Sequence, residues 1–355
     1  MVKKEYSDLK IAWFPEKLDS LLKEKVTAPI HVRIKPTNKC VHNCFYCVYN
    51  PKFSSIHSDI DRISEIPKEK MMEVLSDLKE IGVKAITFSG GGEPLFYPHI
   101  EETLKKVKEY GFDYAMITNA QLLSGKKAEL LADAKWVRVS ADYCNPDIFE
   151  DIRETPKEKF PEVRDNIKNF AKIKNPKCAF GINFVVHIKN KDKIYESAKF
   201  FRDLGVDYIR FSPVWNPDFL KYHEPFKEQV IEQIKKAREE LETDKFRVLD
   251  TFKKDFELSN ISERTYSKCY FMQVNPVIAA DQIVYFCHNK AYDKDGALGS
   301  IKDKSFKDLW FSQEAADKFK NFDCKKGCKH QCSNDPKNIL IGDILGSFGE
   351  HVNFI

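Results

Sequence analysis

The sequence lacks the features of secreted, membrane and nucleic-acid-binding proteins. Its first ten residues, MVKKEYSDLK, contain no apolar segment typical of a signal peptide, and no stretch approaches the roughly 18 apolar residues of a membrane span. We therefore expect a cytoplasmic protein. Long runs of one charge are also missing, since 58 Lys and Arg face 54 Asp and Glu. Nucleic-acid binding and strong phosphate binding are accordingly not predicted.

Composition also excludes a disordered chain and a small disulfide scaffold. The chain has 355 residues, of which 42% are hydrophobic and 32% charged. Because a typical domain has about 150 residues, this length predicts two domains. Disulfides are not expected for ten cysteines in a cytoplasmic protein. Eight of the cysteines form two groups, which favours metal chemistry. The groups are Cys40, Cys44 and Cys47, and then Cys269, Cys287, Cys324, Cys328 and Cys332, with Cys144 and Cys178 between them as small buried side chains.

Short apolar runs alternate with amphipathic segments from residue 31 to about residue 215. The predicted strands are 31–35, 85–89, 114–118, 136–141, 181–187 and 208–212, and the predicted helices are 68–81, 99–110, 126–133, 162–173 and 192–204. Such repetition predicts an α/β fold with a parallel sheet, either an open doubly wound sheet or a curved partial barrel. In both, function resides at the carboxyl ends of the strands, where the first cysteine group falls.

The sequence changes character beyond the last of these units. We expect a long helix over 226–242, a polar linker without periodicity, a hairpin over 273–287 and a short helix over 306–322. The predicted division is an N-terminal extension (1–30), an α/β domain (31–242), a linker (243–265), a small cysteine-rich domain (266–332) and a C-terminal tail (333–355).

The first cysteine group has the spacing C-x3-C-x2-C and includes Tyr46 before its last cysteine. Three thiolates on a short loop can hold three corners of a [4Fe–4S] cluster, which leaves the fourth iron open to a small molecule. A zinc ion held by the same cysteines and His42 is the alternative.

This loop resembles that of the radical S-adenosylmethionine superfamily, and Ser89-Gly90-Gly91-Gly92-Glu93-Pro94 resembles the family's GGEP segment. The resemblance implies a partial (β/α)6 barrel. It also implies that the open iron chelates S-adenosylmethionine, whose reductive cleavage yields a 5′-deoxyadenosyl radical. We expect the glycines to allow close approach of the methionine amino group. For Glu93, a helix-capping role is the alternative.

Further matches to this family are weaker. Thr118-Asn119 resembles its TNG segment, with Ala120 in place of glycine, and Ser140 belongs to a sequence that resembles VSxD. Arg153 lies in a segment that often holds the S-adenosylmethionine carboxylate. The resemblance thus makes Tyr46, Asn119, Ser140 and Arg153 candidate cofactor-binding residues. Ordinary hydrogen bonding at strand ends is the alternative for these side chains.

The second cysteine group resembles a shortened SPASM module, or twitch domain, which carries one auxiliary [4Fe–4S] cluster. Residues 299–310 resemble the segment that links the two cysteine pairs of that module. The resemblance implies the ligands Cys269, Cys287, Cys324 and Cys328, with Cys332 spare or replacing Cys328. A zinc site built from Cys324, Cys328, His330 and Cys332 is the alternative. A fully ligated cluster would act in electron transfer.

For the function, the sequence favours a radical enzyme acting on a sugar, cyclitol or nucleotide-sugar, with a flavodoxin- or ferredoxin-like electron donor. A peptide substrate is the alternative, disfavoured because only 39 residues precede Cys40. A two-cluster electron carrier is a third hypothesis. Candidate substrate contacts at strand ends are Asn183, Arg210, Ser212 and Trp215, with Tyr285 beside the second cysteine group. No catalytic base is predicted.

Overall fold

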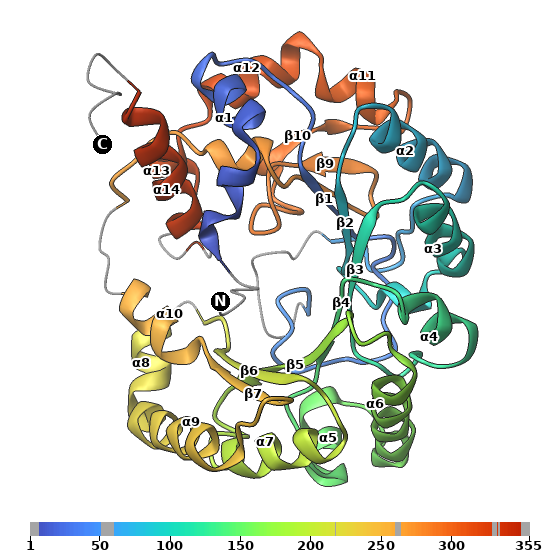
Figure 1. Ribbon diagram of the computed structural model, residues 1–355, viewed down its shortest axis with the longest axis vertical. Coiled ribbons are helices and arrows are strands. Elements are labelled where there is room, and N and C mark those ends of the chain that lie inside the picture. The colour runs from blue at the N-terminus through green and yellow to red at the C-terminus, as the bar shows by residue number, and fades with distance from the viewer. Residues whose placement is uncertain are drawn as a thin grey trace.

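The computed structural model describes residues 7–50, 60–216, 218–259, 264–328, 332 and 334–348. Over these residues the strands form one sheet in the order β10-β9-β8-β1-β2-β3-β4-β5-β6-β7. Pairing is parallel from β1 to β7 and between β1 and β8, whereas β8, β9 and β10 pair antiparallel. The parallel strands curve, with helices on their outer side (Figure 1). The partial-barrel expectation is therefore confirmed.

The six predicted strands are present, each within two residues of its expected ends. They are β1 (His31–Ile34), β2 (Ala85–Phe88), β3 (Asp113–Thr118), β4 (Trp136–Ser140), β5 (Ala179–Val186) and β6 (Tyr208–Pro213). Burial alternates along β1 and β4, so that one set of side chains packs against the helices and the other points into the curve of the sheet. Alternation therefore determines which residues face the interior.

The predicted helices also form and cover the outer face. They are α2 (Lys68–Glu80), α3 (Ile100–Glu109), α4 (Gly125–Leu131), α6 (Phe160–Ile173), α7 (Ile194–Asp203) and α9 (Lys227–Leu241). The glycines after α2, α3 and α7 have φ angles of 85°, 74° and 89°, which are left-handed values that a helix stop requires. Before residue 243, three short helices of the described residues were not predicted, namely α1 (Pro15–Leu22), α5 (Pro146–Arg153) and α8 (Phe219–His223). Isolated 3-10 turns occur at η1 (Asp8–Trp13), η2 (Pro94–Phe96), η3 (Lys157–Lys159), η4 (Glu224–Phe226), η5 (Tyr270–Gln273) and η6 (Lys294–Gly296).

The linker expectation for residues 243–265 is wrong. This segment contains β7 (Arg247–Asp250), which extends the sheet beside β6, and α10 (Phe252–Ser259). Phe252 and Phe256 are buried in the main core, one helical turn apart. With only four residues in the strand and two aromatic residues in the helix, each periodic pattern was too short to recognise among charged neighbours.

The C-terminal region differs from expectation in two further ways. The single helix expected over 306–322 is two, α11 (Phe306–Trp310) and α12 (Gln313–Asn321), because Ser312 caps the second by accepting a hydrogen bond from Ala315 N. A short helix, α13 (Cys324–Gly327), follows α12. The segment expected to be a tail then contains a longer helix, α14 (Asp335–Gly346). Helix α14 packs against the N-terminal segment through a small core that includes Ile11, Leu18 and Ile341.

The predicted hairpin is present but shorter. It comprises β8 (Val277–Ile278) and β9 (Ile283–Tyr285), followed by β10 (Ala297–Ser300). Because β8 pairs with β1, the cysteine-rich region shares the barrel's sheet. Within the described residues, no helix combines the length and apolar character that a membrane crossing needs.

Candidate functional site

The first cysteine group lies on the loop that leaves the carboxyl end of β1. Cys40 Sγ accepts hydrogen bonds from His42 N at 3.4 Å and from Asn119 Nδ2 at 3.8 Å. Cys44 Sγ accepts one from Arg153 Nη1 at 3.1 Å. Cys40 is exposed, whereas burial, followed by the charge of Cys44, raises the pKa of Cys47. The Cys47 thiol would thus ionise readily only beside a strong positive charge, such as iron.

The glycine segment packs directly against the start of this loop. Gly92 N donates to Thr37 O at 3.1 Å, and Glu93 N donates to Lys39 O at 2.9 Å. A Cβ placed on Gly92 would lie 2.0 Å from Lys39 O, and one on Gly91 would lie 2.2 Å from Asn38 Oδ1. Contacts within the chain therefore already require glycine here, so a ligand's approach is not needed to explain these residues.

Glu93 is fully engaged inside the protein. Its carboxylate accepts hydrogen bonds from Thr118 Oγ1 at 2.6 Å, Asn119 N at 2.7 Å and Leu95 N at 3.0 Å. The hydrogen bond from Leu95 N caps η2, which agrees with the helix-capping role considered for Glu93 in the sequence analysis. Burial raises the pKa of Glu93, while these donors lower it. Glu93 thus joins the glycine segment to the end of β3 and positions Asn119.

Arg153 links the end of β4 to the first cysteine loop. Its guanidinium is 3% exposed, forms an ion pair with Asp142 Oδ1 at 2.5 Å and donates to Ser140 O at 2.9 Å. The Ser140 residue thus contributes its main-chain oxygen to this contact. The Tyr46 ring lies 5.9 Å from the Arg153 guanidinium. The predicted cofactor-binding residues therefore surround one cysteine loop.

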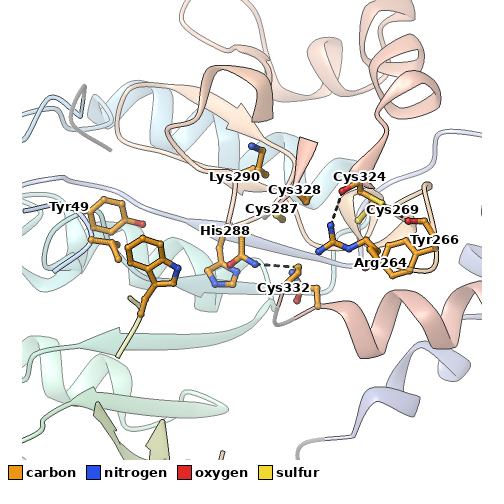
Figure 2. Close-up of a pocket in the computed structure, with 14 residues that line it drawn as sticks. Tyr49, Arg264, Tyr266, Cys269, Cys287, His288, Lys290, Cys324, Cys328 and Cys332 are labelled. Atoms are coloured by element: carbon orange, nitrogen blue, oxygen red, sulfur yellow. Dashed lines mark hydrogen bonds between the residues drawn. The ribbon is translucent and has the colours of Figure 1, made fainter. Parts of the chain in front are cut away.

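The five C-terminal cysteines line one cavity of about 280 Å³ (Figure 2). Burial is the first cause of a raised pKa for each of the five, and the charges of neighbouring cysteines raise the pKa further for Cys269, Cys287, Cys324 and Cys328. For Cys287 the pKa rises to about 12 and for Cys328 to about 11. Several soft donors whose negative forms repel one another suit an iron–sulfur cluster, whose positive irons relieve that repulsion.

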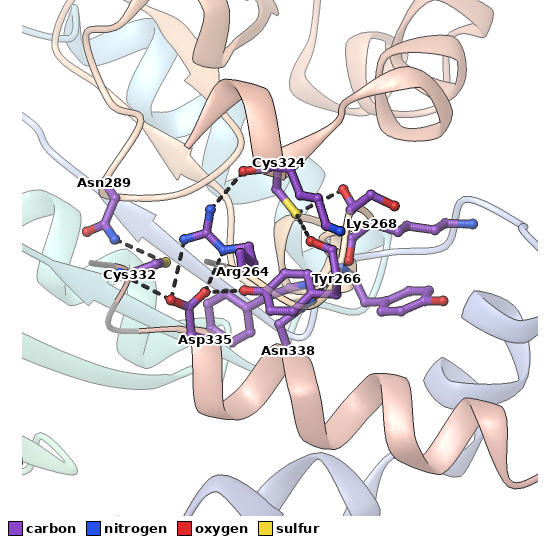
Figure 3. Close-up of polar contacts among 12 residues, drawn as sticks. Arg264, Tyr266, Lys268, Asn289, Cys324, Cys332, Asp335 and Asn338 are labelled. Atoms are coloured by element: carbon purple, nitrogen blue, oxygen red, sulfur yellow. Dashed lines mark hydrogen bonds and ion pairs between the residues drawn. The ribbon is translucent and has the colours of Figure 1, made fainter. Parts of the chain in front are cut away.

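Helix α14 braces the loops that carry these cysteines (Figure 3). Asn338 accepts hydrogen bonds from Tyr270 N and Phe271 N, beside Cys269, and donates to Lys268 O. Arg264 pairs with Asp335 at 3.0 Å and donates to Cys324 O at 2.7 Å. The segment expected to be a tail is therefore part of the site's support.

Cys332 does not stand apart from the other four cysteines. It lines the same cavity, and its Sγ accepts a hydrogen bond from Asn289 Nδ2 at 3.3 Å. Cys324 Sγ, by comparison, is hydrogen-bonded to Ser267 O at 2.9 Å. The choice of four ligands among the five stays a prediction.

The zinc alternatives and the two isolated cysteines can be placed as well. In the described part of the chain, no three His, Cys, Asp or Glu side chains are arranged to hold a single metal ion. His42 bonds Gln121 Oε1 at 2.9 Å, and His330 lies outside the described residues. Cys144 and Cys178 are buried free thiols, as expected of small apolar side chains.

Lys35, which the sequence analysis did not single out, lies between the two cysteine groups. It is 2% exposed, donates to Tyr49 Oη at 2.6 Å and lies 4.7 Å from the ring centres of Tyr49 and Tyr292. Burial lowers its pKa to about 7, an effect opposed by the charges of Cys47 and Cys287, one from each group. The alternation 31, 33, 35 along β1 was the available signal, since it places Lys35 on the inner face.

The predicted substrate contacts divide into two sets. Asn183 and Arg210 are partners in the β5–β6 register, and Asn183 Nδ2 donates to Ser212 Oγ at 3.3 Å, so these three share the inner face. Trp215 instead lines the second cysteine cavity. Tyr285 is buried and donates to Asp281 Oδ2 at 2.6 Å within the small sheet.

A partial barrel with three cysteines after its first strand and a further cysteine-lined cavity beside the same sheet is the framework of an iron–sulfur radical enzyme. Family comparison agrees: residues 34–201 match the radical SAM superfamily, and residues 269–333 match the SPASM iron–sulfur cluster-binding domain. The chain belongs to the radical SAM superfamily and carries a C-terminal SPASM domain. The family is enzymatic, and its cofactors are a [4Fe–4S] cluster with S-adenosylmethionine and auxiliary iron–sulfur chemistry in the SPASM domain.

Curated relatives resemble the barrel half of the chain. The GTP 3′,8-cyclase of Limosilactobacillus fermentum is 26% identical over 52% of this chain and 55% of its own length. A probable GTP 3′,8-cyclase of Methanocaldococcus jannaschii is 31% identical over 52% of this chain and 59% of its own. The matches thus span little more than half of these relatives.

Solved structures resemble nearly the whole fold. Streptococcus suis SuiB bound to the precursor peptide SuiA has a TM-score of 0.63 at 18% identity, covering 87% of this chain and 70% of that one. Native anSMEcpe with bound AdoMet has a TM-score of 0.59 at 20% identity, covering 86% and 88%. At these identities the likeness establishes the fold alone.

Proposed function

We propose that this protein is a radical enzyme that removes hydrogen from a small molecule, namely a sugar, cyclitol or nucleotide-sugar, and dehydrogenates or otherwise modifies it. When bound, the first cluster and S-adenosylmethionine supply a 5′-deoxyadenosyl radical, and the auxiliary cluster supplies an acceptor or relay for one electron. An external flavodoxin- or ferredoxin-like protein provides the starting electron.

Around the first cluster, the chain's own residues would divide two tasks. Cys40, Cys44 and Cys47 would ligate iron, and the Arg153 guanidinium would stabilise the Cys44 thiolate that it already contacts at 3.1 Å. The cofactor would lie among Tyr46, Asn119, Ser140 and the glycine segment 90–92. Glu93 would act by holding Asn119 in position, because its carboxylate is bonded to the chain.

Around the second cluster, the proposed ligands are Cys269, Cys287, Cys324 and Cys328, with Cys332 in place of Cys328 as the alternative. All five line the cavity of Figure 2. Trp215, which follows β6, lines the same cavity. A fully ligated cluster there has no free iron for substrate, so electron transfer is the role that it supports.

The observation that carries the proposal is the position of Lys35. Its ammonium contacts Tyr49, two residues after Cys47, and Tyr292, five residues after Cys287, so the inner face of β1 borders both cysteine-bearing segments. A substrate held on this face would be within reach of both. Its polar lining, which includes Asn183, Arg210 and Ser212, suits a hydroxyl-bearing molecule.

A peptide substrate is the second candidate. SuiB was solved with its precursor peptide, and anSMEcpe with AdoMet and the peptide Kp18Cys, and both share this fold. The relatives named GTP 3′,8-cyclase, in contrast, are 26% to 32% identical over about half of this chain or less and favour a nucleotide-like small molecule.

Anaerobic reconstitution followed by product analysis tests the proposal. Protein with dithionite and S-adenosylmethionine should yield 5′-deoxyadenosine and methionine, and should contain about eight irons per chain if two cubanes are present. Absence of 5′-deoxyadenosine would favour the electron-carrier hypothesis. When substrates are compared, nucleotide-sugars or sugars should raise 5′-deoxyadenosine output above the uncoupled rate, whereas stimulation by peptides alone would favour a peptide maturase.

A further inference from the structure

The inner face of the barrel sheet carries several positive charges. On β1, Val32 and Ile34 are fully buried against the helices, so Arg33 and Lys35 point to the opposite, inner side. On β4, the same alternation places Arg138 on that side. Arg33 and Arg138 are both partly exposed, whereas the residues on either side of them in the same strands are buried.

The two arginines of this group lack acidic partners. Within the described part of the chain, the Arg33 and Arg138 guanidinium groups make no ion pair or hydrogen bond, and Arg138 Nε is buried without a partner. Lys35 is hydrogen-bonded to the neutral hydroxyl of Tyr49, and the negative charge of Asp281, between β8 and β9, partly offsets the effect of burial on the pKa of Lys35. Along β1 to β6, the acidic side chain on the inner face is Asp113, which is 59% exposed and paired with Lys135.

The cations are also close enough to repel one another. Burial, followed by the charge of Arg138, lowers the pKa of Arg33 to about 10. For Lys35, the charge of Arg33 adds to the effect of burial. A protein that keeps like charges together and partly desolvated gives up stability, and such an arrangement usually serves binding of the opposite charge.

We propose that Arg33 and Arg138, with Lys35, bind a phosphate of the substrate, so that the enzyme acts on a phosphorylated or nucleotide-linked small molecule. This inference rests on the proposed function and narrows its substrate class. Arginine forks match phosphate oxygens in pairs, and a phosphate's two charges would balance the group. The near-neutral charge of the whole chain hides this site, because surface acids offset the interior cations.

A competing role for these cations is to balance the negative charge of the clusters, since Cys287 acts on both Arg33 and Lys35. The two roles differ in what an arginine-to-glutamine change does. For phosphate binding, Arg33→Gln and Arg138→Gln would weaken ligand binding and leave iron content unchanged. For cluster support, iron content would fall and ligand binding per loaded chain would not.

The test uses reconstituted holoprotein under anaerobic conditions, with S-adenosylmethionine and no reductant. Calorimetry would measure binding of pyrophosphate, uridine diphosphate glucose and free glucose. We expect the two phosphate compounds to bind far more tightly than glucose. Arg33→Gln and Arg138→Gln should each lower the affinity for these two compounds at least about tenfold, because charged hydrogen bonds are lost. The matched control is Arg164→Gln, at an exposed position on α6, which should bind like wild type.

Melting of the apoproteins provides a second measurement. Removing an unpaired, repelled charge should leave the melting temperature unchanged or raise it in both variants, whereas loss of a stabilising contact would lower it. Equal pyrophosphate affinity in wild type and variants, or no pyrophosphate binding by wild type, would overturn the phosphate site. Wild-type protein assayed in parallel for 5′-deoxyadenosine tests the proposed function separately, so the two failures are distinguishable.

Discussion

Asn338 offers a sharp test of whether α14 holds the second cysteine site together. It is 1% exposed and makes three hydrogen bonds to the segment around Cys269, with Tyr270 N at 2.6 Å, Phe271 N at 3.2 Å and Lys268 O at 3.0 Å. At a net value of about 1 kcal/mol each, Asn338→Ala should weaken this attachment by about 3 kcal/mol. The segment should then open locally more often than in wild type.

Hydrogen exchange of the apoprotein measures this directly. About 3 kcal/mol corresponds to a roughly 100-fold increase in exchange of the Tyr270 and Phe271 amides, with little change at the buried Met116 amide in β3. Reconstituted Asn338→Ala should also contain fewer irons than wild type. Asn321→Ala, at an exposed site at the end of α12, is the matched control. Wild-type exchange at both amides, or equal acceleration throughout the barrel, would refute the reasoning.

Three further changes test other parts of the site. Gly92→Ala should lower the iron content of the first site, because the added Cβ would lie 2.0 Å from a main-chain oxygen. The control is Gly346→Ala, whose added Cβ meets nothing within 4 Å and which should leave the measured iron content unchanged. Cys328→Ala should reduce iron from about eight to about four per chain and Cys332→Ala should not, with the reverse result assigning Cys332 as the ligand. Burial lowers the pKa of Lys35 from 10.5 to about 7, so the unfolded chain binds the extra proton between these values and stability falls as pH decreases through that window. In urea unfolding of the apoprotein, Lys35→Met should therefore have a higher free energy of unfolding than wild type. The difference should grow from near zero at about pH 10.5 to at most about 5 kcal/mol at about pH 7. A difference independent of pH would contradict this prediction.

Local patterns predicted the barrel and both cysteine groups. Each of the strands β1 to β6 and each of the main outer helices is encoded by a short stretch of periodic residues, and the C-x3-C-x2-C loop lies within eight residues of the sequence. The environment of that loop was harder to predict. Arg153 contacts Cys44 across 109 residues, and Glu93 contacts Asn119 across 26. The resemblance to a known family supplied those residues, whereas periodicity did not.

Non-local contacts explain most of what was missed. Asn338 lies 68 residues from Tyr270, so nothing near Cys269 indicated that a later helix would brace it. The inner cations were visible only as alternate residues of strands that the sequence placed correctly. The repulsion between Arg33 and Arg138 is a property of the folded sheet, because the two residues are 105 residues apart along the chain and lie on different strands, β1 and β4.

Ala120 shows how a departure from the family pattern can be energetically neutral. It occupies the place of glycine after Thr118-Asn119 and has a φ of 67°, a left-handed value that strains an alanine by about 1–2 kcal/mol. Ala120→Gly would remove this strain. It would also remove a fully buried methyl group, worth about 0.8 kcal/mol, and add backbone freedom to the unfolded chain worth about 0.5–1 kcal/mol. The opposing effects nearly cancel, so urea unfolding of the apoprotein should change by less than about 1 kcal/mol. A gain above about 2 kcal/mol would mean that the methyl group contributes nothing and that strain alone governs this turn.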